Sequence, residues 1–236
     1  MKRLFISLAI LAGISLSSCN DSFLEKTPVT DLTENNAFNS YDNFKAFMWP
    51  CYEMFTNNTI RTSLQGFGQD GQYKGDMAAG YFQQKYESGY NEFAYQTVAS
   101  VASGNGWDFK SFIRRVNIML SHIDNSSMTE AQKDHWRAVG YFFHSFWYME
   151  LIDRFGDVPW VDQVLQEDSP EAYGPRVDRK TVADKVLERL QWAEQNIGNF
   201  TSQDGDNTIN QDCVRAVISR FGLREGTWRK YHELGR

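Results

Sequence analysis

The segment from Thr129 to Phe155 limits the possible folds of this chain more than any other part of the sequence. Thr129 and Gln132 have the spacing of a capping box, which predicts that a helix begins there, and Gly156 with Pro159 predicts its end. Apolar side chains cover more than half of the circumference of this predicted helix: Trp136, Val139, Phe142, Phe143, Phe146, Trp147, Met149 and Ile152. Such a helix must be buried on several sides, so we expect it at the centre of an array of helices.

Apolar residues recur at three- and four-residue spacing in four other segments, which predicts four further helices. These helices cover residues 41–55, 107–123, 179–196 and 211 onward. We expect Pro50 to kink the first helix or to divide it in two. Gly222 and Gly226 are expected to let the last helix pack closely against a neighbour. No segment has a convincing strand pattern, so the sequence predicts an all-α fold of antiparallel helix pairs with long loops.

The composition is that of a folded domain with an excess of acidic residues. Of the 236 residues, 42% are apolar and 15% aromatic, which excludes a disordered chain, a collagen and a small disulfide-rich scaffold. The formal net charge is -6 at pH 7, so the chain has no global positive field that would attract nucleic acid. We therefore expect no nucleic-acid partner.

The N-terminus has the organisation of an export signal. Lys2 and Arg3 precede an apolar run at residues 4–16, which is shorter than the roughly 20 residues that span a bilayer. The tetrapeptide Leu-Ser-Ser-Cys that ends at Cys19 resembles the bacterial lipobox. We therefore expect a lipoprotein signal peptide at residues 1–18 and a lipid anchor on Cys19. The alternative is an ordinary signal peptide followed by an incidental cysteine.

Two cysteines remain once Cys19 carries lipid. Cys51 and Cys213 would meet an oxidising compartment after export. There they either form one disulfide or remain two separate thiols. Nothing in the sequence fixes the distance between them, so both alternatives stay open.

The region after the signal divides into an arm, a first helix and a long loop region. Residues 19–40 are polar, contain Pro28 and lack helical periodicity, which predicts a tether or an extended arm before a helical domain at residues 41–236. Residues 57–106 are rich in glycine and tyrosine and are expected to form surface loops. Tyr81, Tyr86 and Tyr90 are our candidate ligand-binding residues, because their rings offer flat apolar faces with hydroxyl groups. The alternative is that these tyrosines pack the loops onto the body.

No motif for catalysis, a metal or a cofactor is present. The sequence has no HExxH, nucleophile elbow, phosphate loop or dinucleotide fingerprint, so we expect no catalytic residues and no cofactor. Asp204-Gly205-Asp206 begins like a calcium loop, but Ile209 stands where the turn needs glycine and Arg215 where glutamate belongs. We interpret this segment as a polar loop and expect no metal site.

Three segments resemble the SusD/RagB family of outer-membrane lipoproteins. WRAVGYFFHSFWYMELIDRFGDVPW, at residues 136–160, resembles the family's aromatic helix and the turn that follows it. GWDFKSFIRRVNIMLSHID, at residues 106–124, and VRAVISRFGLREGTWRKYH, at residues 214–232, are similar to an earlier and a later family helix. Together with the lipobox and the arm, these segments occur in the family's order and cover nearly all of the chain.

The resemblance implies tetratricopeptide-like helix pairs and a function in nutrient uptake. Family members are lipid-anchored on the outer face of the outer membrane and bind glycans or other nutrients above a SusC-like TonB-dependent transporter. They are binding proteins and not enzymes. The resemblance also implies structural roles for two groups of residues. Gly156, Asp157 and Pro159 would shape the end of the long helix, and Trp107, Arg115 and Asn117 would organise helix packing.

Family members are usually more than twice as long, so we expect this chain to be the N-terminal part of a larger SusD-like fold. Two other functions remain open. One is a lipid-anchored helical-repeat scaffold whose tyrosine-rich loops bind proteins of the cell envelope. The other is a lipid-anchored glycosidase. We consider it the weakest of the three, because no carboxylate pair stands out in the sequence.

Overall fold

The computed structural model describes residues 38–55 and 110–232, which belong to one compact unit that spans Phe38–Arg236. Their elements are α3 (Tyr41–Met48), η2 (Trp49–Phe55), α6 (Lys110–His122), α7 (Glu130–Phe155), η4 (Pro170–Tyr173), α8 (Arg179–Asn196), α9 (Thr201–Asp204) and α10 (Gln211–Tyr231). No strand occurs in these two ranges, where the only pairing of this kind is an isolated antiparallel bridge between Val158 and Val177. The prediction of an all-α fold is confirmed.

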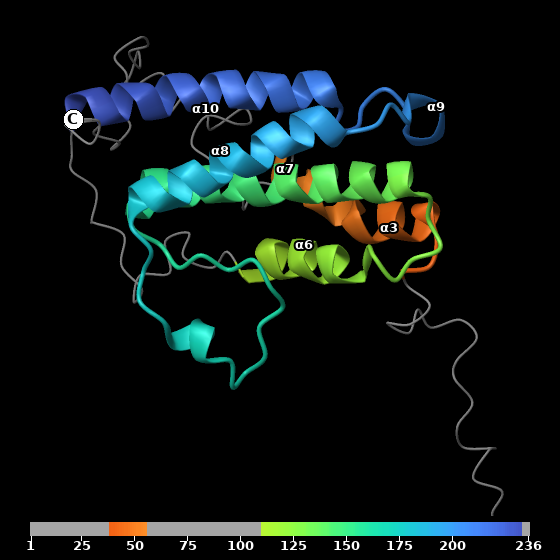
Figure 1. Cartoon of the computed structure of the whole chain (residues 1–236), viewed down its shortest axis with the longest axis horizontal. Helices are drawn as coiled ribbons and strands as arrows, with labels where there is room; N and C mark the ends of the chain where they lie inside the picture. Colours follow the sequence, from red (N-terminus) through yellow and green to blue (C-terminus); the bar gives the residue numbers. More distant parts are fainter. Residues whose placement is uncertain (1–37, 56–109, 233–236) are drawn as a thin grey trace, which may run out of the picture. The chain divides into compact units, whose positions relative to one another are not determined.

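Helix α7 is the central element of this unit. It contacts α6 and α8 extensively and α10 at fewer points, while α10 lies mainly on α8 and α3 on α6. Figure 1 shows α6, α7, α8 and α10 in succession, with alternating directions. The helices are therefore consecutive antiparallel pairs, and α7 is covered on several sides as its apolar circumference predicts.

Both ends of α7 form as the sequence predicts. The Thr129 amide donates to Gln132 Oε1 at 3.0 Å, and the Gln132 amide donates to Thr129 Oγ1 at 3.4 Å, which completes the capping box. Gly156 ends the helix at a φ of 70°, a conformation that a residue with a Cβ adopts at a cost, and its amide donates to Ile152 O at 3.0 Å. Local signals alone therefore fix the length of the central helix.

The first predicted helix changes type at its proline. Ser40 caps α3 by accepting from the Asn43 amide at 3.4 Å, and the α-helical hydrogen bonds stop at Met48. The chain continues as the 3-10 helix η2 from Trp49, with Pro50 as its second residue. Because proline has no amide hydrogen and clashes with the preceding turn, the division at Pro50 follows the prediction.

The close helix contact predicted for α10 is wrong. Gly222 and Gly226 are exposed, and a Cβ built on either would meet none of the described residues within 4 Å. The buried residues of α10 are Val214, Phe221 and Glu225, so a different face of the helix lies against its neighbours. A close approach of helices occurs instead at Gly140 of α7, where a Cβ would lie 2.6 Å from Met119 Cε of α6.

Cys51 is buried and Cys213 is partly buried, and both are free thiols. Of the two alternatives that the sequence leaves open for these cysteines, the structure therefore has the separate thiols and not the disulfide. Burial raises the pKa of the Cys51 thiol to about 12, so this side chain stays protonated at physiological pH.

None of the described helices combines the length and the hydrophobicity that a membrane span requires.

Candidate functional site

The residues predicted to contact lipid or ligand lie outside the described part of the structure. This applies to Cys19 and to Tyr81, Tyr86 and Tyr90, and Trp107, to which the resemblance gives a packing role, lies outside it as well. The described residues contain three features with functional potential: the segment after α7, a network of charged residues, and a buried aspartate beside a cavity.

The segment that follows α7 is held by polar side chains from two helices. Asn117 of α6 donates through Nδ2 to Val161 O at 3.2 Å and to Gln163 O at 3.0 Å. His144 of α7 donates through Nε2 to Val161 O at 2.8 Å. Burial, together with the nearby Arg189 cation, lowers the pKa of His144 to about 3, so its imidazole is neutral. Asn117 therefore organises packing, as the resemblance implies.

Tyr148 completes this support. Its hydroxyl donates to Pro159 O at 3.0 Å and accepts from the Val161 amide at 2.7 Å. Burial raises the pKa of Tyr148, so the hydroxyl keeps its proton. Each of these side chains satisfies a backbone group of the segment after α7, so their shared role is to hold that segment in place.

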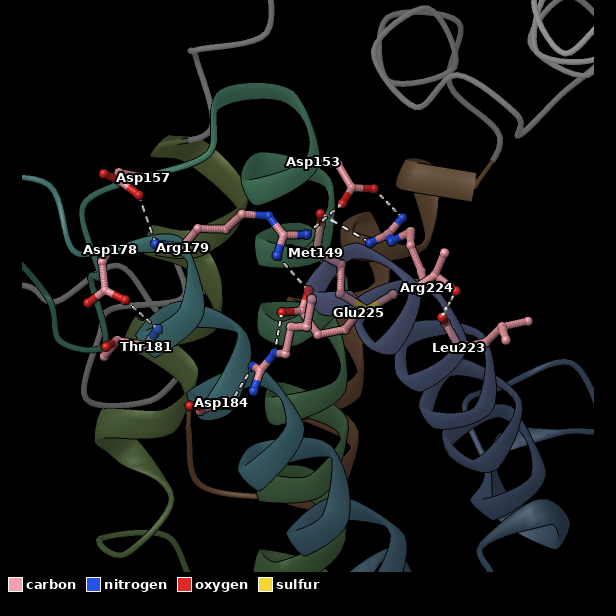
Figure 2. A network of polar contacts seen from close by, with 12 residues as sticks. Met149, Asp153, Asp157, Asp178, Arg179, Thr181, Asp184, Leu223, Arg224 and Glu225 are labelled. Carbon is pink, nitrogen blue, oxygen red and sulfur yellow. Dashed lines mark hydrogen bonds and ion pairs between the residues drawn. The ribbon is translucent and has the colours of Figure 1, made fainter. Parts of the chain in front are cut away.

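The turn also starts the next helix. Asp157 accepts through Oδ1 from the Arg179 amide at 2.8 Å, and Asp178 accepts from the Thr181 amide at 2.9 Å (Figure 2). Both carboxylates lie at the N-terminus of α8, where the helix dipole favours negative charge. The role predicted for Asp157 in shaping the turn thus extends to capping α8.

Arg115 connects α6 to α3. Its Nη1 donates to Phe47 O at 2.9 Å, and its guanidinium carbon lies 4.9 Å from the centre of the Phe47 ring. The side chain therefore satisfies a carbonyl near the end of α3 and packs on an aromatic face at the same time. This contact agrees with the packing role that the resemblance implies.

A network of charged residues joins the ends of three helices. Glu225 of α10 accepts from Arg179 Nη1 of α8 at 2.7 Å through Oε2 and from Arg229 Nε at 2.8 Å through Oε1. Arg229 also donates to Asp184 Oδ1 of α8 at 2.6 Å. The side chains of Arg179 and Glu225 are only 8% and 9% exposed. Figure 2 shows that Arg179 and Glu225 point toward each other.

The same network reaches α7 through Asp153. This carboxylate pairs with Arg224 of α10 and lies 3.8 Å from Arg179 Nη2, while Arg224 Nη2 donates to Met149 O at 3.3 Å. Burial raises the pKa of Asp153, and the two arginines act in the opposite direction. Because both oxygens of Glu225 are used within the protein, the network positions α10 and does not form an open site.

Aromatic rings on the α7–α8 face are also occupied by the protein itself. The guanidinium carbon of Arg189 lies 4.9 Å from the ring centres of both Trp160 and Tyr141. Lys185 Nζ lies 5.3 Å from the Trp160 ring, and Tyr141 makes an edge contact with Trp192 at 5.2 Å. Cations already stack on these rings, so they are not free platforms for a ligand.

Asp204, at the end of α9, is the centre of a buried polar cluster. Tyr41 of α3 donates its hydroxyl to Asp204 Oδ2 at 2.5 Å, and Lys45 Nζ lies 3.4 Å from Oδ1. His135 of α7 places Nε2 3.5 Å from Oδ2, while its Nδ1 donates to Gly198 O at 3.1 Å. The Asp204 side chain is 5% exposed. Helices α3 and α7, which are distant in the sequence, therefore hold the segment between α8 and α10 in place.

The interpretation of residues 204–206 as a polar loop is therefore wrong for Asp204. The residue ends a short helix, and Gly205 follows it at a φ of 87°. Burial lowers the pKa of His135, and the Asp204 carboxylate opposes this shift. Burial and the hydrogen bond to Asp204 both raise the pKa of Tyr41. No local pattern could have revealed this cluster, because its members come from three separate segments.

A cavity of about 290 Å³ lies beside this cluster. We call it the α9 cavity. Its wall consists of His135, Ile197, Gly198, Asn199, Phe200, Thr201, Asp204, Thr208, Ile209, Asn210, Gln211 and Asp212. No lysine or arginine belongs to this wall among the residues that the structure describes. The α9 cavity is thus polar, with carboxamide, hydroxyl and carboxylate groups and one aromatic ring, and it is our candidate binding site among the described residues.

The comparisons with known proteins agree with this architecture. A SusD-like family model, described as "Starch-binding associating with outer membrane", matches residues 22–223. No curated protein matches the chain at a significant level.

Two solved structures are similar to the chain. A SusD-like protein from Bacteroides fragilis NCTC 9343 is 17% identical with a TM-score of 0.62, over 86% of this chain and 39% of its own. A SusD-like carbohydrate binding protein from Bacteroides vulgatus ATCC 8482 is 20% identical with a TM-score of 0.59, over 82% of this chain and 43% of its own. The chain thus spans about two fifths of the length of these proteins. With the family model matching most of its residues, the chain belongs to the SusD/RagB family of SusD-like proteins.

Proposed function

We propose that this chain is a surface-exposed outer-membrane lipoprotein that binds glycans and acts with a SusC-like TonB-dependent transporter in their uptake. The observation that carries the proposal is the match of residues 22–223 to a family described as starch-binding and associated with the outer membrane. The carbohydrate-binding protein of similar fold from Bacteroides vulgatus supports the ligand class. The protein binds its ligand without chemical conversion.

The lipid anchor is assigned to Cys19. The cationic start, the short apolar run and the lipobox-like tetrapeptide support acylation of this thiol after removal of residues 1–18. Acyl chains hold a body to a membrane because each buried methylene contributes about 0.8 kcal/mol. Cys19→Ala should abolish labelling by palmitate and release the protein from the membrane fraction, whereas Cys213→Ala should change neither. Unchanged labelling of the Cys19→Ala protein would disprove the anchor.

The ligand contacts are assigned to Tyr81, Tyr86 and Tyr90. Their rings supply apolar faces on which a sugar ring can stack, and their hydroxyls supply polar contacts.

The test is isothermal titration of the mature chain in detergent with maltoheptaose, laminarin oligosaccharides and a set of peptides. We expect an oligosaccharide to bind and the triple alanine variant of the three tyrosines to bind about tenfold or more weakly. The matched control is the double variant Tyr173→Ala and Tyr231→Ala, because both side chains are exposed and belong to other elements. Peptide binding without saccharide binding would favour the scaffold, and release of reducing ends would favour the glycosidase.

The transporter partner is tested in cells that express the chain. Cross-linking at the surface, followed by purification of the chain, should recover a TonB-dependent transporter, and loss of the chain should slow glycan uptake. Normal uptake without the chain would contradict the proposed partnership.

A further inference from the structure

We propose that the α9 cavity is a second binding site, for one or two sugar rings of a neutral saccharide. This inference rests on the proposed function in one respect, the choice of a saccharide as the class of ligand. Its location comes from the described residues between α8 and α10, and none of its wall residues belongs to the predicted tyrosine site.

Asp204 provides the first argument, because it fixes the wall of the cavity. Its side chain lines the cavity and is 5% exposed, with Oδ1 paired to Lys45 Nζ at 3.4 Å. Its other oxygen, Oδ2, accepts from the Tyr41 hydroxyl. Both oxygens are thus held by α3, so this part of the wall keeps its position and the ligand contacts come from the neighbouring polar groups.

The carboxamides of the wall provide the second argument. Asn199 Oδ1 accepts from the Thr201 amide at 3.2 Å and from its hydroxyl at 2.7 Å, and Asn210 Oδ1 accepts from the Cys213 amide at 3.0 Å. Both oxygens are therefore fixed by the protein, and the Nδ2 groups are the remaining donors. Thr208 donates its hydroxyl hydrogen to Gly205 O at 3.0 Å, so its oxygen is an acceptor. The wall thus offers both donors and acceptors, which a sugar hydroxyl requires.

Phe200 provides an apolar surface in the same wall. Its ring lies against His135 at 4.7 Å and Tyr41 at 5.1 Å between centroids. The ring also lies over Gly198, where a Cβ would come within 2.5 Å of Phe200 Cε2. These contacts fix the position of an aromatic side chain next to the polar groups, a combination that suits a sugar ring with its apolar face.

The charges of the cavity favour a neutral ligand. None of the described lysines and arginines lines it, which disfavours an anion. The Asp204 carboxylate is balanced by Lys45 at 3.4 Å, and Asp212 lies 3.7 Å from Arg215 with a side chain that is 91% exposed. Since neither carboxylate is a buried charge without a counter-ion, the cavity has no strong requirement for a cationic ligand. Its volume of about 290 Å³ is suited to a small ligand.

The experiment blocks the cavity by substitution. The probes are maltose, cellobiose and laminaribiose, and binding is measured by saturation-transfer NMR and titration in the chain that carries alanine at Tyr81, Tyr86 and Tyr90. We expect at least one disaccharide to bind this chain, and Thr201→Phe to abolish that binding because the new ring occupies the cavity. Ser202→Phe is the matched control, because Ser202 is an exposed residue of the same helix that does not line the cavity.

Asn199→Asp provides a second variant in case Thr201→Phe disturbs folding, which circular dichroism would detect, because it keeps the oxygen that accepts from Thr201. It removes a donor and should weaken binding about tenfold. If alanine at the three tyrosines already abolishes all binding, the second site is excluded while the proposed function stands. Equal binding by Thr201→Phe and Ser202→Phe also excludes it. If the unmodified chain binds none of these saccharides or those of the first test, both proposals fail.

Discussion

Single buried polar residues determine how this protein responds to pH. His135 and His144 are both buried in α7, and burial lowers the pKa of each imidazole below its ordinary value of 6.5. His144 is held by a backbone carbonyl, and His135 lies against both a carbonyl and the Asp204 carboxylate. The two histidines therefore belong to structural contacts, and their neutral forms are the ones that the fold stabilises.

His144 gives a prediction for stability against pH. Its pKa is about 3 in the folded protein, so between about 3 and 6.5 the unfolded chain binds more protons than the folded one. The free energy of unfolding should therefore fall as the pH is lowered through this window, by about 1.4 kcal/mol for each unit of pKa difference at full effect. Urea denaturation at a series of pH values should show a shallower dependence for His144→Gln. His232→Gln, at an exposed position, should keep the dependence of the unmodified protein. Equal slopes for all three proteins would contradict this role of His144.

At the scale of elements, α10 is held by buried apolar side chains and, in its C-terminal half, by ion pairs. Val214, Phe221 and Glu225 are its buried residues, and Leu223 and Tyr231 are 76% and 74% exposed. The contacts of Glu225, Arg224 and Arg229 with α7 and α8 hold its C-terminal half. Because a buried ion pair is stable only while both partners are present, this attachment is sensitive to the loss of one group.

Glu225→Gln tests that attachment. The substitution keeps the shape of the side chain but leaves the buried Arg179 guanidinium without its closest carboxylate. We expect the free energy of unfolding to fall by about 3 kcal/mol in urea denaturation. Glu171→Gln, at an exposed position of η4, should change it little. Equal effects of the two variants would show that the network does not hold α10.

The glycines of α10 and α7 give a second prediction at this scale. Gly222 lies within an exposed helix surface, and no residue of 38–55 or 110–232 lies within 4 Å of its Cβ position, so Gly222→Ala should raise the free energy of unfolding by about 1 kcal/mol. Gly140 is buried between α6 and α7, and Gly140→Ala should lower it by about 1 kcal/mol or more because the methyl group meets Met119 and Leu120. Thermal and urea denaturation measure both changes. A loss of stability in Gly222→Ala would instead show that this glycine lies in the close helix contact that the sequence predicts.

At the scale of the whole molecule, the described helices share one apolar core. The core is formed by large apolar side chains from α3, η2, α6, α7, α8 and α10, of which the largest fully buried ones are Tyr148, Phe44, Phe143 and Phe221. Burial of one such side chain contributes about 1.5–3 kcal/mol. Segments as distant as α3 and α9 are joined by the Tyr41–Asp204 hydrogen bond, without a covalent crosslink between Cys51 and Cys213.

The free thiols give a prediction for the intact protein. A reducing agent should leave the midpoint of thermal unfolding unchanged, because no disulfide between Cys51 and Cys213 restricts the unfolded chain. Mass spectrometry after unfolding and alkylation without reduction should find both cysteines modified. A midpoint that falls on reduction, together with protection from alkylation, would instead show that the two cysteines form a disulfide.

The sequence by itself determined the helices and their ends, because these depend on residues close together in the chain. Thr129 and Gln132, Pro50 and Gly156 act on backbone groups within a few residues, and the periodicity of α7 shows that it is central. The tertiary structure alone decided which face of α10 is buried, that Cys51 and Cys213 remain apart, and that Asp204 meets Tyr41, Lys45 and His135 beside a cavity. These contacts join segments that are distant in the sequence, and only the packing of whole helices brings such segments together.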